Sequence, residues 1–483
     1  MKYIEQIKSV ILFVLVLLSI TLTFSIWTYR PNYAPLEKTK SVDILVGKKL
    51  QLVDIIKPYR MVFHQDGMWL GTDQSKEMSG IIDQMQNWQV TNPTLVSGNL
   101  DSSKINQLVA GNQRYTLFYS SEIPYSIFQD FLPTTENKVN DISFDQMIVT
   151  WNQLSNSGEL TVFFANTAEE KLYKAKAHVK SKSIFEKQLV RLSHDLERYS
   201  VFYREKGTAL YLPTKESKMI QSAYIVNNIS VDKFKNAVFA NPEVVKNSFD
   251  DANVEENFTD GVSIMKVNSN KRVLDYVNTT ASDNHERVEK SKLIINTFDF
   301  INRHGGWTGD FRYDSLDYEN NKVTYQLYMG DYPVYADLLD TSTQIVTVWG
   351  DNRIAVYARP YYKLVPSLEN TTLTITGGQE VVDNLMKLKT VNFKDIKEIR
   401  PGYFLTKNGR GLVKVWPFIS CKKCVIYAAL QSQYGHFLTH AHRTPPAQKS
   451  PDRSAHGWHY RQTFSDVVLR DGSRIDSIRD DVF

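Results

Sequence analysis

The feature that most constrains this chain is an uncharged apolar segment near its N-terminus. Residues Ser9 to Trp27 read SVILFVLVLLSITLTFSIW, without an acidic or a basic side chain. A helix of about 19 residues reaches roughly 28 Å, close to the thickness of the hydrocarbon core of a bilayer. Tyr29 follows where aromatic residues anchor helices at a membrane surface, and Pro31 favours a helix end. The sequence therefore predicts one transmembrane helix over residues 9–27.

A cleaved signal peptide is the alternative interpretation of this segment. Such peptides have a shorter apolar region that ends in a small-residue cleavage site, and no such site follows here. Lys2 and Lys8 make the stub at residues 1–8 positive, which favours a cytoplasmic N-terminus. No later segment is apolar enough to cross again. We expect a single-pass protein of the cell membrane with its bulk outside the cytoplasm.

One face of the predicted helix is a candidate for contact with a partner helix. Val16, Ser19 and Thr23 are spaced at i, i+3 and i+7, so they share a face. Small hydroxyl side chains allow helices to approach closely and to form hydrogen bonds across the interface in lipid. The alternative is that Ser19 and Thr23 bond only to carbonyl groups one turn earlier in their own helix.

The region after the helix predicts an α+β fold with antiparallel sheets and packed helices. The whole chain has 26 Tyr and 24 Phe, residue types that favour strands. Alternating apolar patterns surround turn pairs at Asp66-Gly67, Gly330-Asp331 and Gly350-Asp351, which is typical of hairpins. Residues 182–199 carry apolar side chains at helical spacing, and Ser230 is a candidate N-cap of a further helix.

A chain of 483 residues exceeds what one hydrophobic core usually supports, so several domains are expected. The formal net charge is +4, without a dense basic stripe, which argues against a nucleic-acid partner. We expect a linker over residues 28–42, an N-terminal α+β domain over 43–180, a middle α+β domain over 181–295, a β-rich C-terminal domain over 296–417 and an atypical, disordered tail over 418–483.

Four stretches carry a resemblance to a known family. They are IKSVILFVLVLLSITLTFSIW (7–27), NISVDKFKNAVFANPEVV (228–245), FDFINRHGGWTGDFRYD (298–314) with the hairpins that follow it (325–335 and 346–362), and IKEIRPGYFLTKNGRGLVKVWP (396–417). Together they resemble the YycH (WalH) family of Gram-positive bacteria. The third stretch is the most specific of the four.

The resemblance implies a non-enzymatic accessory protein of the WalK/WalR (YycG/YycF) two-component system, which controls cell-wall metabolism. Such proteins act on the sensor histidine kinase together with a sister regulator of the YycI type, through transmembrane helices and pairing of the outer domains. It also implies a YycI-like C-terminal domain and no cofactor, and it leaves open whether the kinase is activated or inhibited. An extracytoplasmic scaffold that binds cell-wall polymer is the alternative, motivated by the aromatic outer region.

The most specific stretch also invites an enzymatic interpretation. The family motif residues are Phe298, Asp299, Asn302, His304, Gly305, Gly306 and Trp307. A histidine beside two glycines can titrate near neutral pH next to exposed amides. However, no nucleophile in a recognised motif and no second histidine at ligand spacing accompanies it. We therefore expect a structural role, with a helix ending at His304, Gly305 after it and Trp307 packed on a sheet.

The end of the chain departs from the family pattern. Cys421, Cys424, His436 and His440 are spaced C-x2-C-x11-H-x3-H, within one residue of a Cys2His2 zinc site. The alternative is an atypical or out-of-frame extension, because the segment lacks a clear apolar finger core. We predict no metal site, and these four residues are the candidates if the tail binds zinc.

Overall fold

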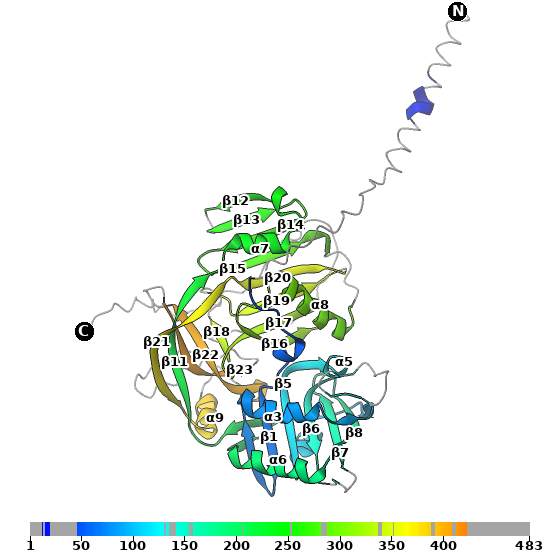
Figure 1. Ribbon diagram of the computed structural model, residues 1–483, viewed down its shortest axis with the longest axis vertical. Helices are drawn as coiled ribbons and strands as arrows, with labels where there is room; N and C mark the ends of the chain where they lie inside the picture. Colours follow the sequence, from blue (N-terminus) through cyan, green and yellow to red (C-terminus); the bar gives the residue numbers. More distant parts are fainter. Residues whose placement is uncertain are drawn as a thin grey trace, which may run out of the picture. The chain divides into compact units, whose positions relative to one another are not determined.

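The structure, a computed structural model, describes residues 46–422 apart from short gaps, together with Leu12 and residues 15–19 (Figure 1). The gaps are 130–131, 135–141, 153, 155–157, 206, 252–253, 282–286, 337–340, 351, 388–391 and 408–411. No helix within this part of the chain is long and apolar enough to cross a membrane. Most of the predicted span at 9–27 lies outside the described residues, so the single transmembrane helix stays a prediction.

The first half of the described chain forms an antiparallel sheet with the order β10-β9-β2-β1-β5-β6-β7-β8-β3, and β4 pairs with β8. Its strands are β1 (Arg60–Gln65), β2 (Met68–Thr72), β3 (Gln89–Val90), β4 (Thr94–Ser97), β5 (Arg114–Pro124), β6 (Ser143–Thr150), β7 (Glu159–Asn166), β8 (Lys171–His178), β9 (Glu197–Phe202) and β10 (Leu210–Pro213). The helices of this half are α2 (Leu52–Ile55), α3 (Ser75–Met85), α4 (Ser102–Val109), α5 (Tyr125–Phe128) and α6 (Lys182–Asp195).

The second half forms a larger sheet with the order β12-β13-β14-β15-β20-β19-β17-β18-β22-β23-β11-β21, and β16 pairs with β17. Its strands are β11 (Ser217–Asn228), β12 (Lys246–Asp250), β13 (Glu255–Thr259), β14 (Ser263–Asn268), β15 (Val273–Asn278), β16 (Asp310–Asp317), β17 (Lys322–Met329), β18 (Tyr332–Ala336), β19 (Gln344–Trp349), β20 (Ile354–Pro360), β21 (Tyr362–Ile375), β22 (Glu398–Lys407) and β23 (Leu412–Lys422). The helices are α7 (Val231–Val238), α8 (Lys290–Arg303) and α9 (Gly378–Lys387), with short 3-10 turns η1 (Pro242–Val244), η2 (Thr279–Ala281) and η3 (Phe393–Asp395).

The predicted α+β class and its local turns are confirmed. Asp66 and Gly67 both have positive φ, at 51° and 74°, as a two-residue turn between right-twisted strands requires. Gly330 likewise joins β17 to β18, and β19 and β20 surround the turn at Gly350. The helix predicted within 182–199 is α6, and Ser230 is the N-cap residue of α7, although its side chain makes no capping hydrogen bond.

One expected boundary differs from the structure. Strand β23 continues through 418–422, so a tail that begins at 418 begins too early. In that stretch Cys421 pairs with Ile399 and Lys422 with Glu398, because the start of β22 needs a partner for its backbone groups.

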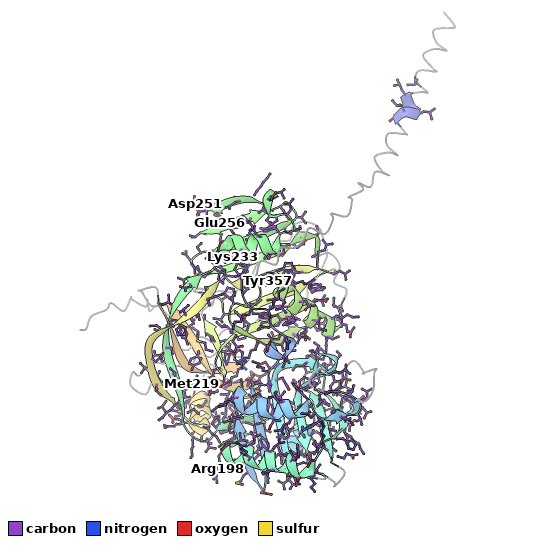
Figure 2. The ribbon with its side chains drawn as sticks, in the orientation of Figure 1. Arg198, Met219, Lys233, Asp251, Glu256 and Tyr357 are labelled. Carbon is purple, nitrogen blue, oxygen red and sulfur yellow. The ribbon has the colours of Figure 1, made fainter. Side chains whose placement is uncertain are left out.

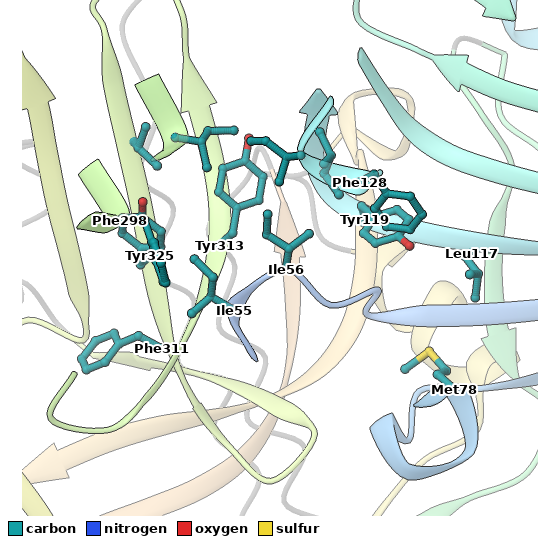
Figure 3. Close-up of a cluster of buried hydrophobic side chains, with 14 of the residues drawn as sticks. Ile55, Ile56, Met78, Leu117, Tyr119, Phe128, Phe298, Phe311, Tyr313 and Tyr325 are labelled. Atoms are coloured by element: carbon teal, nitrogen blue, oxygen red, sulfur yellow. The ribbon is translucent and has the colours of Figure 1, made fainter. Parts of the chain in front are cut away.

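Residues of the expected middle domain, 181–295, contribute to both sheets. Strand β9 pairs with β2 of the first sheet, whereas β11 begins the second sheet beside β21 and β23. Buried side chains of both halves also belong to one continuous hydrophobic cluster. Figure 3 shows Ile55 and Ile56 within this cluster, with Tyr313 of the second half on one side and Tyr119 of the first half on the other.

Candidate functional site

The family motif, which spans the end of α8 and the residues just after it, contacts the first described residues of the outer region. We call residues 46–50 the N-terminal strap. Lys48 and Trp307 exchange two backbone hydrogen bonds, each 2.9 Å long, and form an isolated antiparallel bridge. The Gly305 carbonyl accepts from the amides of Val46 and Gly47 at 3.1 and 2.7 Å. The strap therefore lies against the motif as an added strand would, held mainly by backbone groups.

Two glycines permit this close approach. A Cβ atom on Gly47 would lie 2.1 Å from the carbonyl oxygen of Trp307. Gly306 has φ +68°, and a Cβ atom there would lie 2.8 Å from the Lys48 carbonyl oxygen. Since real Cβ atoms do not approach backbone so closely, any larger residue at Gly47 must displace the strap.

Asn302 ties three parts of the site together. Its side-chain amide donates to the Leu50 carbonyl at 3.0 Å, and its Oδ1 accepts from the Leu50 amide at 3.0 Å. The same Oδ1 accepts from the indole nitrogen of Trp307 at 2.9 Å. One side chain on α8 thus fixes both the end of the strap and the orientation of the tryptophan.

Trp307 packs on the sheet, as predicted. It is 2% exposed, and its ring meets that of Tyr325 on β17 edge-on, with centroids 5.1 Å apart. Phe298 of α8 covers it at 5.8 Å. The Tyr325 hydroxyl forms a 2.8 Å hydrogen bond with Thr297, which satisfies the polar end of that ring.

Arg359 of β20 supports the motif from inside the protein. Its guanidinium is fully buried and donates to the Gly306 carbonyl at 2.9 Å, the Tyr357 hydroxyl at 2.6 Å and the Thr308 hydroxyl at 2.9 Å. It also lies over the ring of Phe234 at 4.9 Å. Figure 2 labels Tyr357 among the side chains of the second half. Carbonyl dipoles and ring faces surround this cation, which is a costly arrangement unless every donor is used.

His304 has the contacts of a helix-end residue. The helix α8 ends at Arg303, with His304 as C-cap and Gly305 at φ +103°, which confirms the predicted helix end. The Nδ1 atom of His304 lies 2.8 Å from the Phe300 carbonyl, and the two rings stack with centroids 4.0 Å apart. Asp299 is exposed on the same helix, and its carbonyl accepts from Arg303.

The other predicted site residues are not brought to this place within the described chain. Val16 and Ser19 lie in a short helical stretch and are exposed, whereas Thr23 lies outside the described residues. Cys421 lies in β23, and Cys424, His436 and His440 are outside the described residues. In the residues that the structure describes, no three His, Cys, Asp or Glu side chains gather as a metal site would require.

Sequence reasoning missed a buried arginine that joins the two sheets. Arg400 of β22 pairs with Glu398 at 3.2 Å and Asp314 at 3.7 Å, and it donates to the Tyr328 hydroxyl at 3.1 Å. Its guanidinium also lies over the ring of Tyr59, 5.2 Å from the centroid, next to the first strand of the other sheet. Burial opposes the charge, but Glu398 and the neighbouring acidic and phenolic groups outweigh it and raise the pKa of Arg400.

Further polar contacts join the halves near this arginine. Arg60 forms a bidentate ion pair with Asp73 at 2.7 and 2.9 Å and donates to the Ile399 carbonyl at 3.2 Å. Asp331, in the β17–β18 turn, accepts from the Ser75 amide at 2.9 Å at the start of α3. A carboxylate of one half therefore satisfies a free amide at the helix N-terminus of the other.

A second polar cluster links α8 to the first sheet. Lys290, at the start of α8, contacts Glu122 of β5 at 2.7 Å. Nearby, Asp145 of β6 accepts hydrogen bonds from both the amide and the hydroxyl of Thr167. Burial raises the pKa of Asp145 to about 6, although the bonds from Thr167 favour its charged form.

This raised pKa predicts a pH-dependent stability. Because the pKa of Asp145 is higher in the folded than in the unfolded chain, the proton it binds stabilises the fold at low pH. That contribution is complete below about pH 4 and is lost as the pH rises through about 6. We expect Asp145→Asn to raise the free energy of unfolding at pH 7.5 by up to about 2 kcal/mol, and by much less at pH 4. Urea unfolding of both purified proteins at the two pH values measures this, and an identical pH dependence would contradict it.

The comparisons with known proteins agree with the resemblance. Residues 5–192 match the family model of the YycH protein, N-terminal domain, and residues 207–422 match that of the YycH protein, C-terminal domain. The chain belongs to the YycH family. The C-terminal match ends at Lys422, where β23 also ends.

A protein sequence and a crystal structure, both of YycH from Bacillus subtilis, are similar to this chain over most of their length. The protein named two-component system WalR/WalK regulatory protein YycH, from strain 168, is 23% identical over 441 residues, which cover 86% of this chain and 94% of the relative. The crystal structure of YycH from Bacillus subtilis matches with a TM-score of 0.65 and 20% identity, covering 78% of this chain and 96% of that one. That structural match shows that the two proteins share a fold.

Proposed function

We propose that this chain is a membrane-anchored, non-enzymatic regulator of a sensor histidine kinase of the WalK type, which controls cell-wall metabolism. The observation that carries the proposal is the similarity, along 86% of the chain, to a protein named as a WalR/WalK regulator. The anchor is the apolar helix at residues 9–27, with a cytoplasmic stub before it and the two sheets outside the cell. No cofactor enters this proposal.

The partners are the kinase and a sister regulator of the YycI type. The kinase is contacted through the transmembrane face at Val16, Ser19 and Thr23, and the sister regulator through the outer region. Val16 and Ser19 are exposed on their short helical stretch. The contacts of the family motif support a structural role for its residues, since Asn302, Gly306 and Trp307 bond within the chain.

Substitutions on the transmembrane face test the proposal. We expect Ser19→Leu/Thr23→Leu to keep the protein in the membrane fraction but to weaken its co-purification with the kinase roughly 3- to 10-fold, because hydroxyl contacts between helices in lipid contribute about 0.6 kcal/mol each and close packing adds to them. Kinase-dependent reporter output should shift towards that of a strain lacking the protein. The measurement is quantitative pull-down from detergent-solubilised membranes, together with the reporter.

The matched control uses the same chemistry on the opposite helix face. Thr21→Leu/Ser25→Leu also replaces one serine and one threonine, and we expect it to behave as the unmodified protein. Equal loss in both variants would argue against a specific face. Failure of the unmodified protein to co-purify with any kinase, combined with retention of cell-wall glycan, would favour the scaffold alternative instead.

A further inference from the structure

We infer that the N-terminal strap couples the membrane anchor to the outer region, because it attaches the chain that follows the anchor to the second sheet. The inference rests on the proposed function for its regulatory output. A docked strap leaves a short length of chain between the membrane and the second sheet, and a released strap leaves a longer one. This difference in length does not depend on the regulatory output.

The hydrogen-bond partners of Val46, Gly47, Lys48 and Leu50 belong to the C-terminal half of the sequence. Val46, Gly47 and Lys48 bond to the backbone of the motif, and Leu50 bonds to Asn302, which is 252 positions away. The ammonium group of Lys363, at the start of β21, donates to the Val46 carbonyl at 3.0 Å. The chain enters the first sheet only afterwards, at β1. The first sheet follows the anchor in the sequence, but the chain attaches to the second sheet before it enters the first.

The contacts of the strap continue into both halves of the protein. Trp307 packs against Tyr325 on β17, and the Gly306 carbonyl accepts a hydrogen bond from Arg359 on β20. Asn302 lies near the end of α8, whose first residue, Lys290, is paired with Glu122 of the first sheet. A displacement of the strap thus acts on a helix that contacts the first sheet at its other end.

The strap can separate without loss of the cores. Val46 is buried and Leu50 is half-buried against the hydrophobic cluster, whereas Lys48 and Lys49 are exposed. Backbone hydrogen bonds hold residues 46–48 to the motif. Segments with few buried apolar contacts open locally at a lower cost than the sheets they lie on. Docked and released straps are therefore two discrete arrangements of one folded protein.

The test uses the full-length protein in lipid nanodiscs. Gly47→Val places a side chain against the Trp307 backbone, whereas Gly98→Val is the matched control, because a Cβ atom on Gly98 meets no heavy atom within 4 Å. In Gly47→Val we expect the amides of Lys48 and Trp307 to exchange about tenfold faster or more. A fluorophore placed at the exposed Met386 should show a broader distribution of energy-transfer distances to dye in the bilayer surface. Gly98→Val should match the unmodified protein in both measurements.

Kinase output is read in parallel, in cells. We expect Gly47→Val to resemble a deletion of the gene while remaining in the membrane fraction. If Gly47→Val does not fold, Asn302→Ala serves instead, since it removes three hydrogen bonds at the strap without adding bulk. Fast exchange of the strap amides with an unchanged distance distribution overturns the coupling inference. A deletion that leaves kinase output unchanged overturns the proposed function, while the distance measurement still decides the coupling.

Discussion

Replacing Trp307 by alanine is expected to lower the free energy of unfolding by about 3–5 kcal/mol, the largest effect of any single truncation in the motif. The side chain is 2% exposed and lies between Phe298 and Tyr325, so its removal leaves a cavity that the rigid sheet cannot close. The Oδ1 atom of Asn302 also loses the indole donor. Equilibrium unfolding by urea, followed by far-UV circular dichroism, measures the change.

Trp69→Ala is the matched control, because it deletes the same side chain at a half-buried position on β2. There the indole stacks on His64, with ring centroids 4.1 Å apart, and keeps part of its surface in water. We expect the free energy of unfolding to fall by roughly 1–2 kcal/mol, since the Trp69 side chain buries less apolar area on folding than the Trp307 side chain does. Equal losses in the two variants would mean that Trp307 does not anchor the motif on the sheet.

Replacing Arg400 by methionine is expected to lower the free energy of unfolding by about 3–5 kcal/mol, because two buried carboxylates then lose the cation that they share. The side chains of Glu398 and Asp314 are only 8% and 14% exposed. The tyrosine hydroxyl that accepts from Arg400, on Tyr328, also loses a donor. Thermal unfolding of the variant and the unmodified protein measures the loss.

A double variant separates lost charge pairing from lost packing. Arg400→Met/Glu398→Gln should recover part of the stability, because the amide carries no charge that needs compensation. A double variant no more stable than Arg400→Met would indicate that packing of the guanidinium, and not its charge, holds this joint together.

Much of the local structure of this protein follows from its sequence alone. The turn at Asp66-Gly67 and the helix end at His304-Gly305 are fixed by residues that tolerate positive φ, so short-range chemistry suffices to place them. Alternating apolar residues likewise identify the hairpins of both sheets. The motif at 298–314 is the most specific of the four stretches that together carry the family resemblance.

The pairing of strands over long distances could not be predicted from the residue pattern. Strand β9 joins the first sheet although the pattern placed it in a middle domain, and β18 pairs in parallel with β22. Strand β23 continues to Lys422, beyond the boundary expected at residue 417. Such pairing uses backbone groups that every residue shares, so it leaves little trace in the residue types.

Some features of the candidate site could be predicted from the sequence and others could not. The packing of Trp307 on the sheet and the place of Gly305 after the helix follow from the local residue pattern. The attachment of residues 46–50 to the motif, and the burial of Arg359 and Arg400, were decided only by the tertiary structure. Glycine at position 47 is needed because another backbone lies 2.1 Å from where its Cβ atom would be, and that neighbour is about 260 positions away in the chain, beyond the reach of any local rule.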